Sequence, residues 1–313
     1  MGSRLVSLLL SLMFVSVVGC GGGGKTNTSA PAMSGTAFST SFTPDHVFLI
    51  VLENHSFSQV IGSPAMPSLN SLATLHGLSS GYFANTHPSI GNYFMVTAGA
   101  METNNDAFTG IVSDNNIVRA LNGAGKTWKA YMESIPAVGY TGGDVYPYSK
   151  HHNPFVFFSD VLSSSVQVTN IVPFTRLASD VSAGAVPQFA FIGPNLIHDA
   201  HDCPGGATAT CPDSDKLATA DNWLHVNIDP LIQNPALANS VFIITFDESV
   251  DTDVTNGGGN VPFILAGSHV KAGFRSATMY QHQSLLRTVL DLLKVSNMPN
   301  GAATAPVMAE FFQ

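Results

Sequence analysis

The chain has 313 residues, a formal net charge of −9 at pH 7 and only 11% charged residues. The negative charge argues against nucleic acid as a partner, because a polyanion would be repelled. Apolar residues make up 45% of the chain, which is ample for one large core, and α/β domains often reach this length.

The N-terminal residues predict export. Arg4 gives a positively charged start, and residues 5–18 form an apolar stretch too short to span a bilayer comfortably. This stretch ends in Val-Val-Gly-Cys at Cys20, which resembles a bacterial lipoprotein box and implies cleavage before Cys20 and lipidation of its thiol. An ordinary secretory signal is the alternative.

Three regions follow from this interpretation. We expect a signal peptide over residues 1–19, a lipidated flexible linker over residues 20–42 and a folded domain over residues 43–313. The linker is rich in Gly, Ser and Thr, as suits a flexible tether. The lipid on Cys20 would attach the protein to a bacterial cell-envelope membrane, on its periplasmic or surface side.

Strands and helices alternate along the folded domain. Apolar, β-branched runs predict strands over residues 47–52, 79–84, 127–132, 188–192, 241–246 and 261–266. Helical spacing predicts helices over residues 66–76, with Gly77 as the C-cap, over 217–232 and over 281–293. This alternation indicates an α/β fold with a mostly parallel central sheet and helices on both faces.

Two of the predicted strands run directly into acidic pairs. Residues 47–52 and 241–246 are continuous apolar runs, typical of strands buried on both faces of a parallel sheet. The side chains that follow them are Glu53, Asn54, Asp247 and Glu248. Because ligands bind at the carboxyl ends of such strands, we expect these groups to share one edge.

Clustered carboxylates repel one another, and oxygen ligands suit Mg²⁺, Ca²⁺ or Mn²⁺. The pattern therefore predicts one divalent metal ion at this edge; participation of a histidine would shift the choice toward Zn²⁺ or Fe. The alternative is that both acidic pairs are ordinary strand-end residues that face water.

Ser89 is a candidate nucleophile. Pro88 fixes the chain before it and Gly91 frees the chain after it, as in a sharp turn that presents a hydroxyl. Near a divalent metal, a serine hydroxyl loses its proton more readily. The alternative is that Ser89 is only a helix N-cap, a position that serine favours.

Histidines cluster in the same predicted loops. His152, His198 and His201 are each able to protonate a leaving oxygen, contact a phosphoryl oxygen or bind a metal. Each is also able to serve as a hydrogen-bonded structural residue, so the spacing alone leaves these roles open.

Two cysteines remain after Cys20. Cys203 and Cys211 predict a disulfide, because an exported chain meets an oxidising compartment. Closing this short loop would contribute about 2.5 kcal/mol of stability in the loop-entropy model. Metal binding by the pair is the weaker alternative.

Several short segments, in this order and spacing, resemble a known family. They are residues 51–57 (Val-Leu-Glu-Asn-His-Ser-Phe), 86–93 (Thr-His-Pro-Ser-Ile-Gly-Asn-Tyr), 128–133, 150–154, 194–202, 246–248 and 261–287. Together they are similar to the phosphoesterase family of bacterial acid phosphatases and phospholipases C, in the alkaline-phosphatase-like superfamily. The resemblance covers about residues 45–295 and implies an alkaline-phosphatase-like fold.

The resemblance also implies residue roles. It assigns the metal to Glu53, Asn54, Asp247 and Glu248, and catalysis to Ser89, Asn92, His152 and His201. In this assignment Ser89 is the nucleophile, Asn92 holds the phosphoryl group and the two histidines face it. The family usually has Pro where this chain has Gly91, which puts the rigidity of the nucleophile turn in doubt. It usually has Arg and Asp where this chain has His55 and Ser58, and neither departure removes a candidate chemical group.

The resulting hypothesis is a metal-dependent hydrolase of phosphate esters, an acid phosphatase that forms a phosphoserine. A phospholipase C or phosphodiesterase of the same family is the alternative, so the substrate is a small phosphomonoester or a phospholipid headgroup. The alternative from another class is a non-catalytic lipoprotein that binds phosphate or metal.

Overall fold

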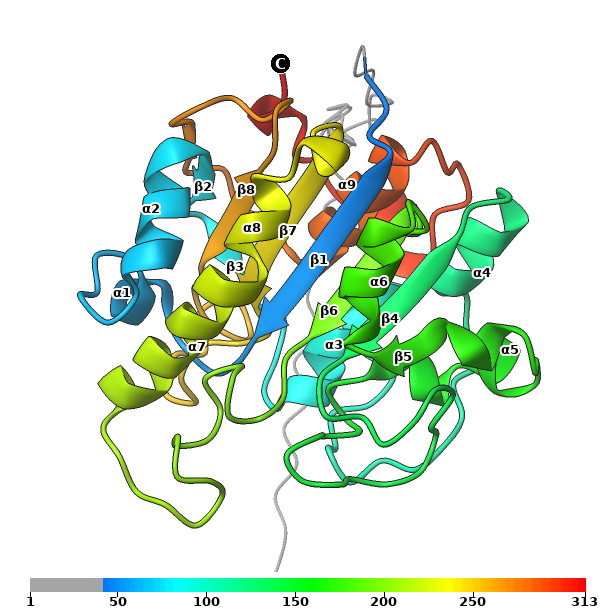
Figure 1. Cartoon of the computed structure of the whole chain (residues 1–313), viewed down its shortest axis with the longest axis horizontal. Helices are drawn as coiled ribbons and strands as arrows, with labels where there is room; N and C mark the ends of the chain where they lie inside the picture. Colours follow the sequence, from blue (N-terminus) through cyan, green and yellow to red (C-terminus); the bar gives the residue numbers. More distant parts are fainter. Residues whose placement is uncertain (1–41) are drawn as a thin grey trace, which may run out of the picture. The chain divides into compact units, whose positions relative to one another are not determined.

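The computed structural model describes residues 42–313 (Figure 1). The predicted signal peptide, the lipidated Cys20 and nearly all of the linker lie outside the described residues. None of the helices found in the described part has the length and apolar character needed to cross a membrane.

Within residues 42–313, eight strands form one mixed sheet in the order β5-β4-β6-β1-β7-β8-β2-β9. The strands are β1 (His46–Leu52), β2 (Gly77–Ser79), β4 (Trp128–Met132), β5 (Ile171–Pro173), β6 (Phe189–Gly193), β7 (Ser240–Phe246), β8 (Phe263–Ala266) and β9 (Arg275–Ser276). Only β8 runs antiparallel to its neighbours β7 and β2 in this described sheet. A separate parallel pair joins β3 (Tyr82–Phe83) to β10 (Tyr280–Gln281).

Helices cover both faces of the sheet. They are α1 (Phe57–Val60), α2 (Pro67–Leu75), α3 (Ser89–Ala98), α4 (Ile117–Gly123), α5 (Ser159–Leu162), α6 (Arg176–Ser182), α7 (Asp213–Asn227), α8 (Asp229–Ile232) and α9 (His282–Leu292). Figure 1 shows α6, α7 and α8 in front of the sheet and α3 and α9 behind it. The predicted α/β architecture is confirmed.

The pairing of β1 with β7 is the centre of the core. The two strands are parallel and in register from His46 beside Ser240 to Leu52 beside Phe246. The rings of Phe48 and Phe242 stack across them at 4.5 Å. Because both strands end at the same level, the residues that follow them emerge at one edge of the sheet.

The predicted strand over residues 79–84 is wrong in extent. It is divided into β2 and β3, because Ser80 and Gly81 form a bend. A Cβ at Gly81 would lie 2.5 Å from the backbone oxygen of Thr278, so the close approach of the C-terminal segment requires glycine there.

Two helix boundaries also differ from the prediction. Gly77 is the first residue of β2 rather than the C-cap of α2, and His76 closes that helix. The single helix predicted over residues 217–232 is interrupted at Ile228, and α8 carries Pro230 in its first turn, where proline is tolerated. Trp223 is buried, whereas Leu231 is only half-buried.

The predicted disulfide between Cys203 and Cys211 is present. It closes the loop that follows His201 and leads into α7. The covalent link therefore ties a loop at the carboxyl edge of the sheet to the start of a helix on its face.

Away from this edge, Asp180 organises a buried polar contact. Its carboxylate accepts hydrogen bonds from Lys129, Tyr131 and Arg176. Burial by itself would raise the pKa of Asp180, but these donors outweigh it and hold the pKa below its usual value of 3.8.

We expect Asp180→Asn to destabilise the fold by about 1–3 kcal/mol at pH 7, because charged donors lose their acceptor. A carboxylate with a lowered folded-state pKa contributes stability above its unfolded pKa and loses it as the pH falls through the folded pKa. The difference between variant and wild type should therefore shrink below about pH 4, in urea denaturation at a series of pH values. A difference that is constant with pH would contradict this account.

Candidate active site

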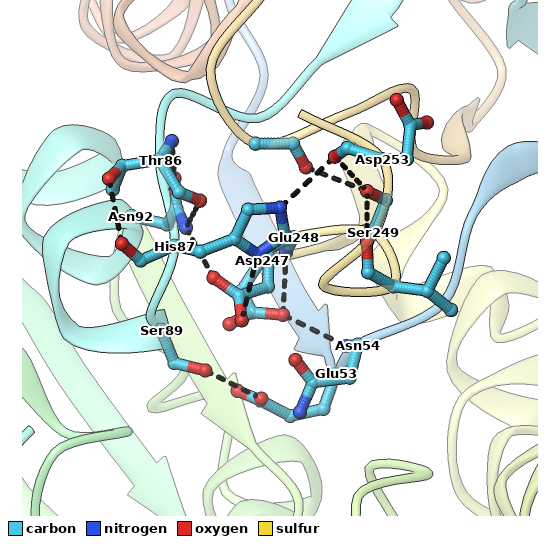
Figure 2. Close-up of polar contacts among 12 residues, drawn as sticks. Glu53, Asn54, Thr86, His87, Ser89, Asn92, Asp247, Glu248, Ser249 and Asp253 are labelled. Atoms are coloured by element: carbon cyan, nitrogen blue, oxygen red, sulfur yellow. Dashed lines mark hydrogen bonds and ion pairs between the residues drawn. The ribbon is translucent and has the colours of Figure 1, made fainter. Parts of the chain in front are cut away.

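The predicted carboxylates meet at the end of β1 and β7. Glu53 follows β1 and is fully buried, and Asp247 and Glu248 follow β7 and are nearly so. The Asp247 N–H donates to the Leu52 oxygen at 2.9 Å, which continues the β-ladder into the site. Figure 2 shows the three carboxylates gathered at this edge.

Asn54 turns the chain at the end of β1. Its φ of 56° lies in the left-handed region, which asparagine tolerates better than most residues. In this conformation its N–H donates to Asp247 Oδ1 at 3.1 Å. The second oxygen of that carboxyl group, Oδ2, is buried and has no hydrogen-bond partner among the described residues.

Ser89 lies opposite Glu53 at the start of α3. Pro88 is the N-cap of the helix, and Ser89 is its first helical residue. The Ser89 hydroxyl donates to Glu53 Oε2 at 3.0 Å (Figure 2). The hydroxyl is therefore directed at the carboxylates, and Ser89 does not act as the helix N-cap.

Asn92 is buried one turn further along α3. Its Oδ1 accepts the N–H groups of Asn85 and Thr86, at 3.0 and 3.2 Å. Its Nδ2 donates to the Thr86 oxygen and to Glu248 Oε2. Both amide hydrogens are thus engaged, so Asn92 fixes the turn before Ser89 and orients Glu248. A contact between Asn92 and a phosphoryl group stays a prediction.

Tyr93 was missed as a site residue. Its hydroxyl donates to Glu53 Oε1 at 2.6 Å, so Ser89 and Tyr93 hold the two oxygens of one carboxylate. The sequence could have indicated this role, because Tyr93 follows Ser89 by four residues and residues i and i+4 share one face of a helix.

His87 was also missed, although it directly precedes Pro88. Its Nδ1 lies 3.3 Å from Glu248 Oε1, and its Nε2 lies 3.1 Å from the backbone oxygen of Asp253. The close ion pair with Glu248 raises the pKa of His87 to about 9, so His87 carries a positive charge at neutral pH.

His152 is buried between two carboxylates. Its Nε2 lies 3.3 Å from Glu53 Oε1, and its Nδ1 lies 3.2 Å from Asp199 Oδ2. Its ring stacks on Tyr93, with the centroids 5.2 Å apart. Burial lowers the pKa of His152 to about 3 and raises the pKa of Asp199 to about 8.

His201 lies near His152 but at the surface of the site. The two ring centroids are 5.9 Å apart, and the His201 side chain is 37% exposed, compared with 3% for His152. Its Nδ1 lies 2.8 Å from Asp202 Oδ1. His198, by contrast, pairs with Glu133 and makes no recorded contact with the buried carboxylates.

A further buried histidine supports the end of β7 from behind. His282, the first residue of α9, has its Nε2 2.6 Å from the Asp247 backbone oxygen and its Nδ1 2.9 Å from the Tyr82 hydroxyl. Burial lowers the pKa of His282 to about 4, so the ring is neutral at neutral pH. Nothing in the sequence indicated that His282 would contact Tyr82 and Asp247.

The carboxylates are electrostatically strained. Burial, followed by the charges of Asp247 and Asp199, raises the pKa of Glu53 well above its usual value. Burial and the charge of Glu248 do the same for Asp247. Within residues 42–313, the recorded ion pairs of these carboxylates are all with histidines.

These observations fit a divalent cation. A cation would supply the charge that the histidines do not fully provide, and the unpartnered oxygen of Asp247 would gain a ligand. Glu53, His152 and Asp199 also form one cluster able to hold an ion, and His87, Glu248 and Asp251 form another. The acidic clusters are thus compatible with a divalent metal.

A cavity of about 330 Å³ is lined by residues that flank this site in the sequence, and by none of the predicted site residues. Asp106 lines it and also accepts the N–H of Ile90, the residue after Ser89. His151, next to His152, lines it as well, together with Asp144 and Lys150. Phe108 and Phe157 line it too, so its lining is both polar and apolar.

Comparisons of sequence find one family and several relatives. The sequence model of the phosphoesterase family matches residues 63–296, a range that contains all the predicted site residues except Glu53 and Asn54. A phosphatidylinositol-3-phosphatase of Mycobacterium tuberculosis is 30% identical over 257 residues, covering 82% of this chain and 79% of that protein.

Fungal acid phosphatases are also similar. A probable acid phosphatase of Kluyveromyces lactis is 30% identical over 258 residues, covering 77% of this chain and 56% of that protein. A phosphate-repressible acid phosphatase of Penicillium chrysogenum is 30% identical over 262 residues, covering 78% of this chain and 58% of that protein. The chain therefore spans little more than half of these fungal relatives.

Among solved structures, a protein of the alkaline phosphatase superfamily from Vibrio parahaemolyticus superposes with a TM-score of 0.62. It is 13% identical, and the match covers 85% of this chain and 70% of that one. At this identity the likeness concerns the fold alone, and it confirms the predicted alkaline-phosphatase-like architecture.

Gly91 is packed closely within the turn that carries Ser89. A Cβ at this position would lie 2.7 Å from Thr86 Cγ2 and 2.8 Å from Asn104 Oδ1. The absence of a side chain therefore lets the loop segments of Thr86 and Asn104 contact the start of α3. Glycine at this position gives close packing around the turn rather than a gap.

We expect Gly91→Ala to destabilise the protein by about 1–3 kcal/mol, because its methyl group overpacks the turn. Gly123→Ala is the matched control, since Gly123 lies in α4 with nothing within 4 Å of a Cβ, and it should stabilise by about 0.5–1 kcal/mol. Thermal unfolding of both variants tests this; equal behaviour of the two would contradict the packing argument.

Proposed function

Since this chain belongs to the phosphoesterase family and is a phosphoric ester hydrolase, we propose that it is a metal-dependent phosphomonoesterase with Ser89 as its nucleophile. The observation that carries the proposal is the Ser89 hydroxyl, which is buried and directed at Glu53 within a cluster of carboxylates. A protein that only bound phosphate or metal would have no need of a hydroxyl in this position.

Four side chains would hold the cation: Glu53, Asn54, Asp247 and Glu248. When bound, the cation neutralises phosphoryl oxygens and lowers the pKa of a neighbouring hydroxyl. The protein keeps these ligands in place through Tyr93, which holds Glu53, and through Asn92, which holds Glu248. The donor set is rich in oxygen, which favours Mg²⁺, Ca²⁺ or Mn²⁺ over Zn²⁺ or Fe.

The reaction then has two displacement steps. Ser89 Oγ attacks phosphorus in line, the Oγ–P bond forms and the bond from phosphorus to the leaving oxygen breaks. The carboxylate of Glu53 already accepts the hydroxyl hydrogen and is its first acceptor. Water next attacks the phosphoserine, which releases inorganic phosphate and restores Ser89.

The two predicted histidines suit different tasks. A leaving alcohol departs toward solvent, and His201 is the exposed one, with Nδ1 held by Asp202. We therefore assign protonation of the leaving oxygen to His201. His152 is buried against Glu53, where it is suited to contact the phosphoryl group instead.

The relatives support a monoester as substrate. They are named acid phosphatases and, in one case, a phosphatidylinositol-3-phosphatase. A phospholipase C or phosphodiesterase is the alternative within the family.

Hydrolysis of p-nitrophenyl phosphate and of its bis(p-nitrophenyl) diester tests the proposal. We expect faster turnover of the monoester, loss of activity with a chelator and recovery when a divalent metal is restored. Preference for the diester would move the assignment to the phospholipase C branch. Stoichiometric binding of phosphate without turnover would identify a binding protein.

Ser89→Ala should lower kcat by about 10³-fold or more, because the nucleophile is lost, while leaving thermal stability close to wild type. Ser182→Ala, an exposed serine on α6, is the matched control and should keep full activity. Near-wild-type turnover by Ser89→Ala would refute the phosphoserine mechanism.

We also propose that the protein is exported and tethered to a cell-envelope membrane through Cys20, which lies outside the described residues. Labelled palmitate supplied to the expressing bacteria should be incorporated into the wild type and not into Cys20→Ser. Equal labelling of both proteins would exclude lipidation at Cys20.

A further inference from the structure

The cavity of about 330 Å³ that is lined by Asp106 and His151 adjoins the predicted site through neighbouring residues. Asp106 Oδ1 accepts the N–H of Ile90, the residue after Ser89, at 3.0 Å. The ring centroid of His151 is 4.5 Å from that of His152. The cavity therefore lies beside the phosphoryl site and is not part of it.

The leaving alcohol belongs on the same side of the site. In-line displacement places the leaving oxygen opposite Ser89 Oγ, and the proposed mechanism protonates that oxygen from His201. The His201 ring centroid is 5.9 Å from that of His152, which contacts His151 in turn. The three rings thus form a continuous series from the leaving oxygen to the cavity, and an alcohol that departs beside His201 would have the cavity next to it.

Two phenylalanine side chains give the cavity an apolar wall. Phe157 is 1% exposed, Phe108 is half-buried, and their ring centroids are 5.6 Å apart. A Cβ at Gly110 would lie 2.5 Å from Phe108 Cζ, so the glycine lets the backbone pack directly against this ring. The Phe108 ring is therefore held by its neighbours and offers a fixed, flat surface to a ligand.

Charged groups surround this wall. Asp106 Oδ1 accepts the N–H of Ile90, and Asp144 Oδ1 accepts that of Lys150 at 2.7 Å. Within residues 42–313, neither carboxylate has a recorded hydrogen bond at Oδ2, so one oxygen of each is available to accept from a ligand. The Lys150 ammonium lies 4.9 Å from the Phe157 ring centroid and adds a donor to the same cavity.

These charges select against an ionic alcohol group. The carboxylates of Asp106 and Asp144 would repel an anionic group. The Lys150 ammonium already occupies the place over the Phe157 ring where a ligand ammonium would bind by a cation–π interaction, and it would repel such a group. The lining therefore suits a neutral group that has an apolar face and both donates and accepts hydrogen bonds. A ring or chain that carries several hydroxyls has these properties.

We propose that this cavity binds the alcohol part of the phosphate ester and that this alcohol is an uncharged polyol, such as a sugar or a cyclitol. Its hydroxyls donate to Asp106 and Asp144 and accept from Lys150, and its C–H face packs on Phe108. The inference rests on the proposed phosphoesterase function and adds to it the chemical class of the substrate and the residues that select it.

Two phosphate esters that differ in their hydroxyl groups test this assignment. Cyclohexyl phosphate and myo-inositol 1-phosphate share a six-membered ring and a phosphoryl group, but only the second carries further hydroxyls. Isothermal titration calorimetry measures the binding of each to full-length, Mn²⁺-supplied Ser89→Ala protein, which does not consume the esters. We expect the inositol ester to bind at least about tenfold more tightly, because one hydrogen bond to a charged group corresponds to about this factor.

Two cavity variants, each made in the Ser89→Ala protein, locate the source of the preference. Lys150→Met removes the donor and keeps a long side chain, and it should lower the preference for the inositol ester about tenfold. Asp106→Asn keeps an oxygen for the Ile90 N–H but replaces the charged Oδ2 by a neutral amide group. It should lower the preference about threefold, because charge-assisted hydrogen bonds are the stronger ones.

Lys271→Met is the matched control. The Lys271 ammonium also lies over a phenylalanine, 5.3 Å from the Phe274 ring centroid, but neither residue lines the cavity. The control should bind both esters like the parent protein. The melting temperature of each variant shows that the fold is retained.

Three results would overturn the inference. They are equal or tighter binding of cyclohexyl phosphate, an unchanged preference in both cavity variants, and equal weakening of both esters in Lys150→Met, which would place the lysine at the shared phosphoryl group. Failure of the proposed function gives a different result, because the wild type would then hydrolyse neither ester nor p-nitrophenyl phosphate. The binding preference needs no turnover and would still decide whether the cavity selects a polyol.

Discussion

The structure depends on the in-register parallel pairing of β1 and β7. This pairing buries two apolar strands at the centre of the core and makes them end at the same level. Glu53 and Asp247 are thereby forced together, with Glu248 next in the chain. The core that stabilises the fold therefore also creates a cluster of buried negative charge, which is unfavourable without compensation.

The remaining elements supply that compensation from several directions. Helix α3 provides donors from one face: Ser89 and Tyr93 hold the two oxygens of Glu53, and Asn92 holds Glu248. The loop before α3 adds a positive charge through His87. Among residues 42–313, Asp247 Oδ2 nevertheless has no hydrogen-bond partner, so the polar network is incomplete without a further positive group. A site that is incomplete in this way is typical of function rather than of structure.

The sequence predicted those features that depend on local pattern. The apolar strands that precede Glu53 and Asp247, and the helix α9, follow clear patterns. Their predicted ends lie within two residues of the observed ends. The bend at Gly81 was missed because it depends on the backbone of Thr278, almost two hundred residues away. The contact between Asp199 and His152 was also missed, because no spacing in the chain encodes a contact between residues 47 positions apart.

Burial sorts the histidines, which the sequence left equivalent. His282 is neutral and supports β7 from behind, His87 is charged beside Glu248, and His152 lies between two carboxylates. Only His201, of these four, is substantially exposed. In the proposed reaction, the phosphoryl group would contact the buried histidines, and the leaving alcohol would face His201 and the solvent. Such a division would make the phosphate the part of the substrate that these buried histidines recognise.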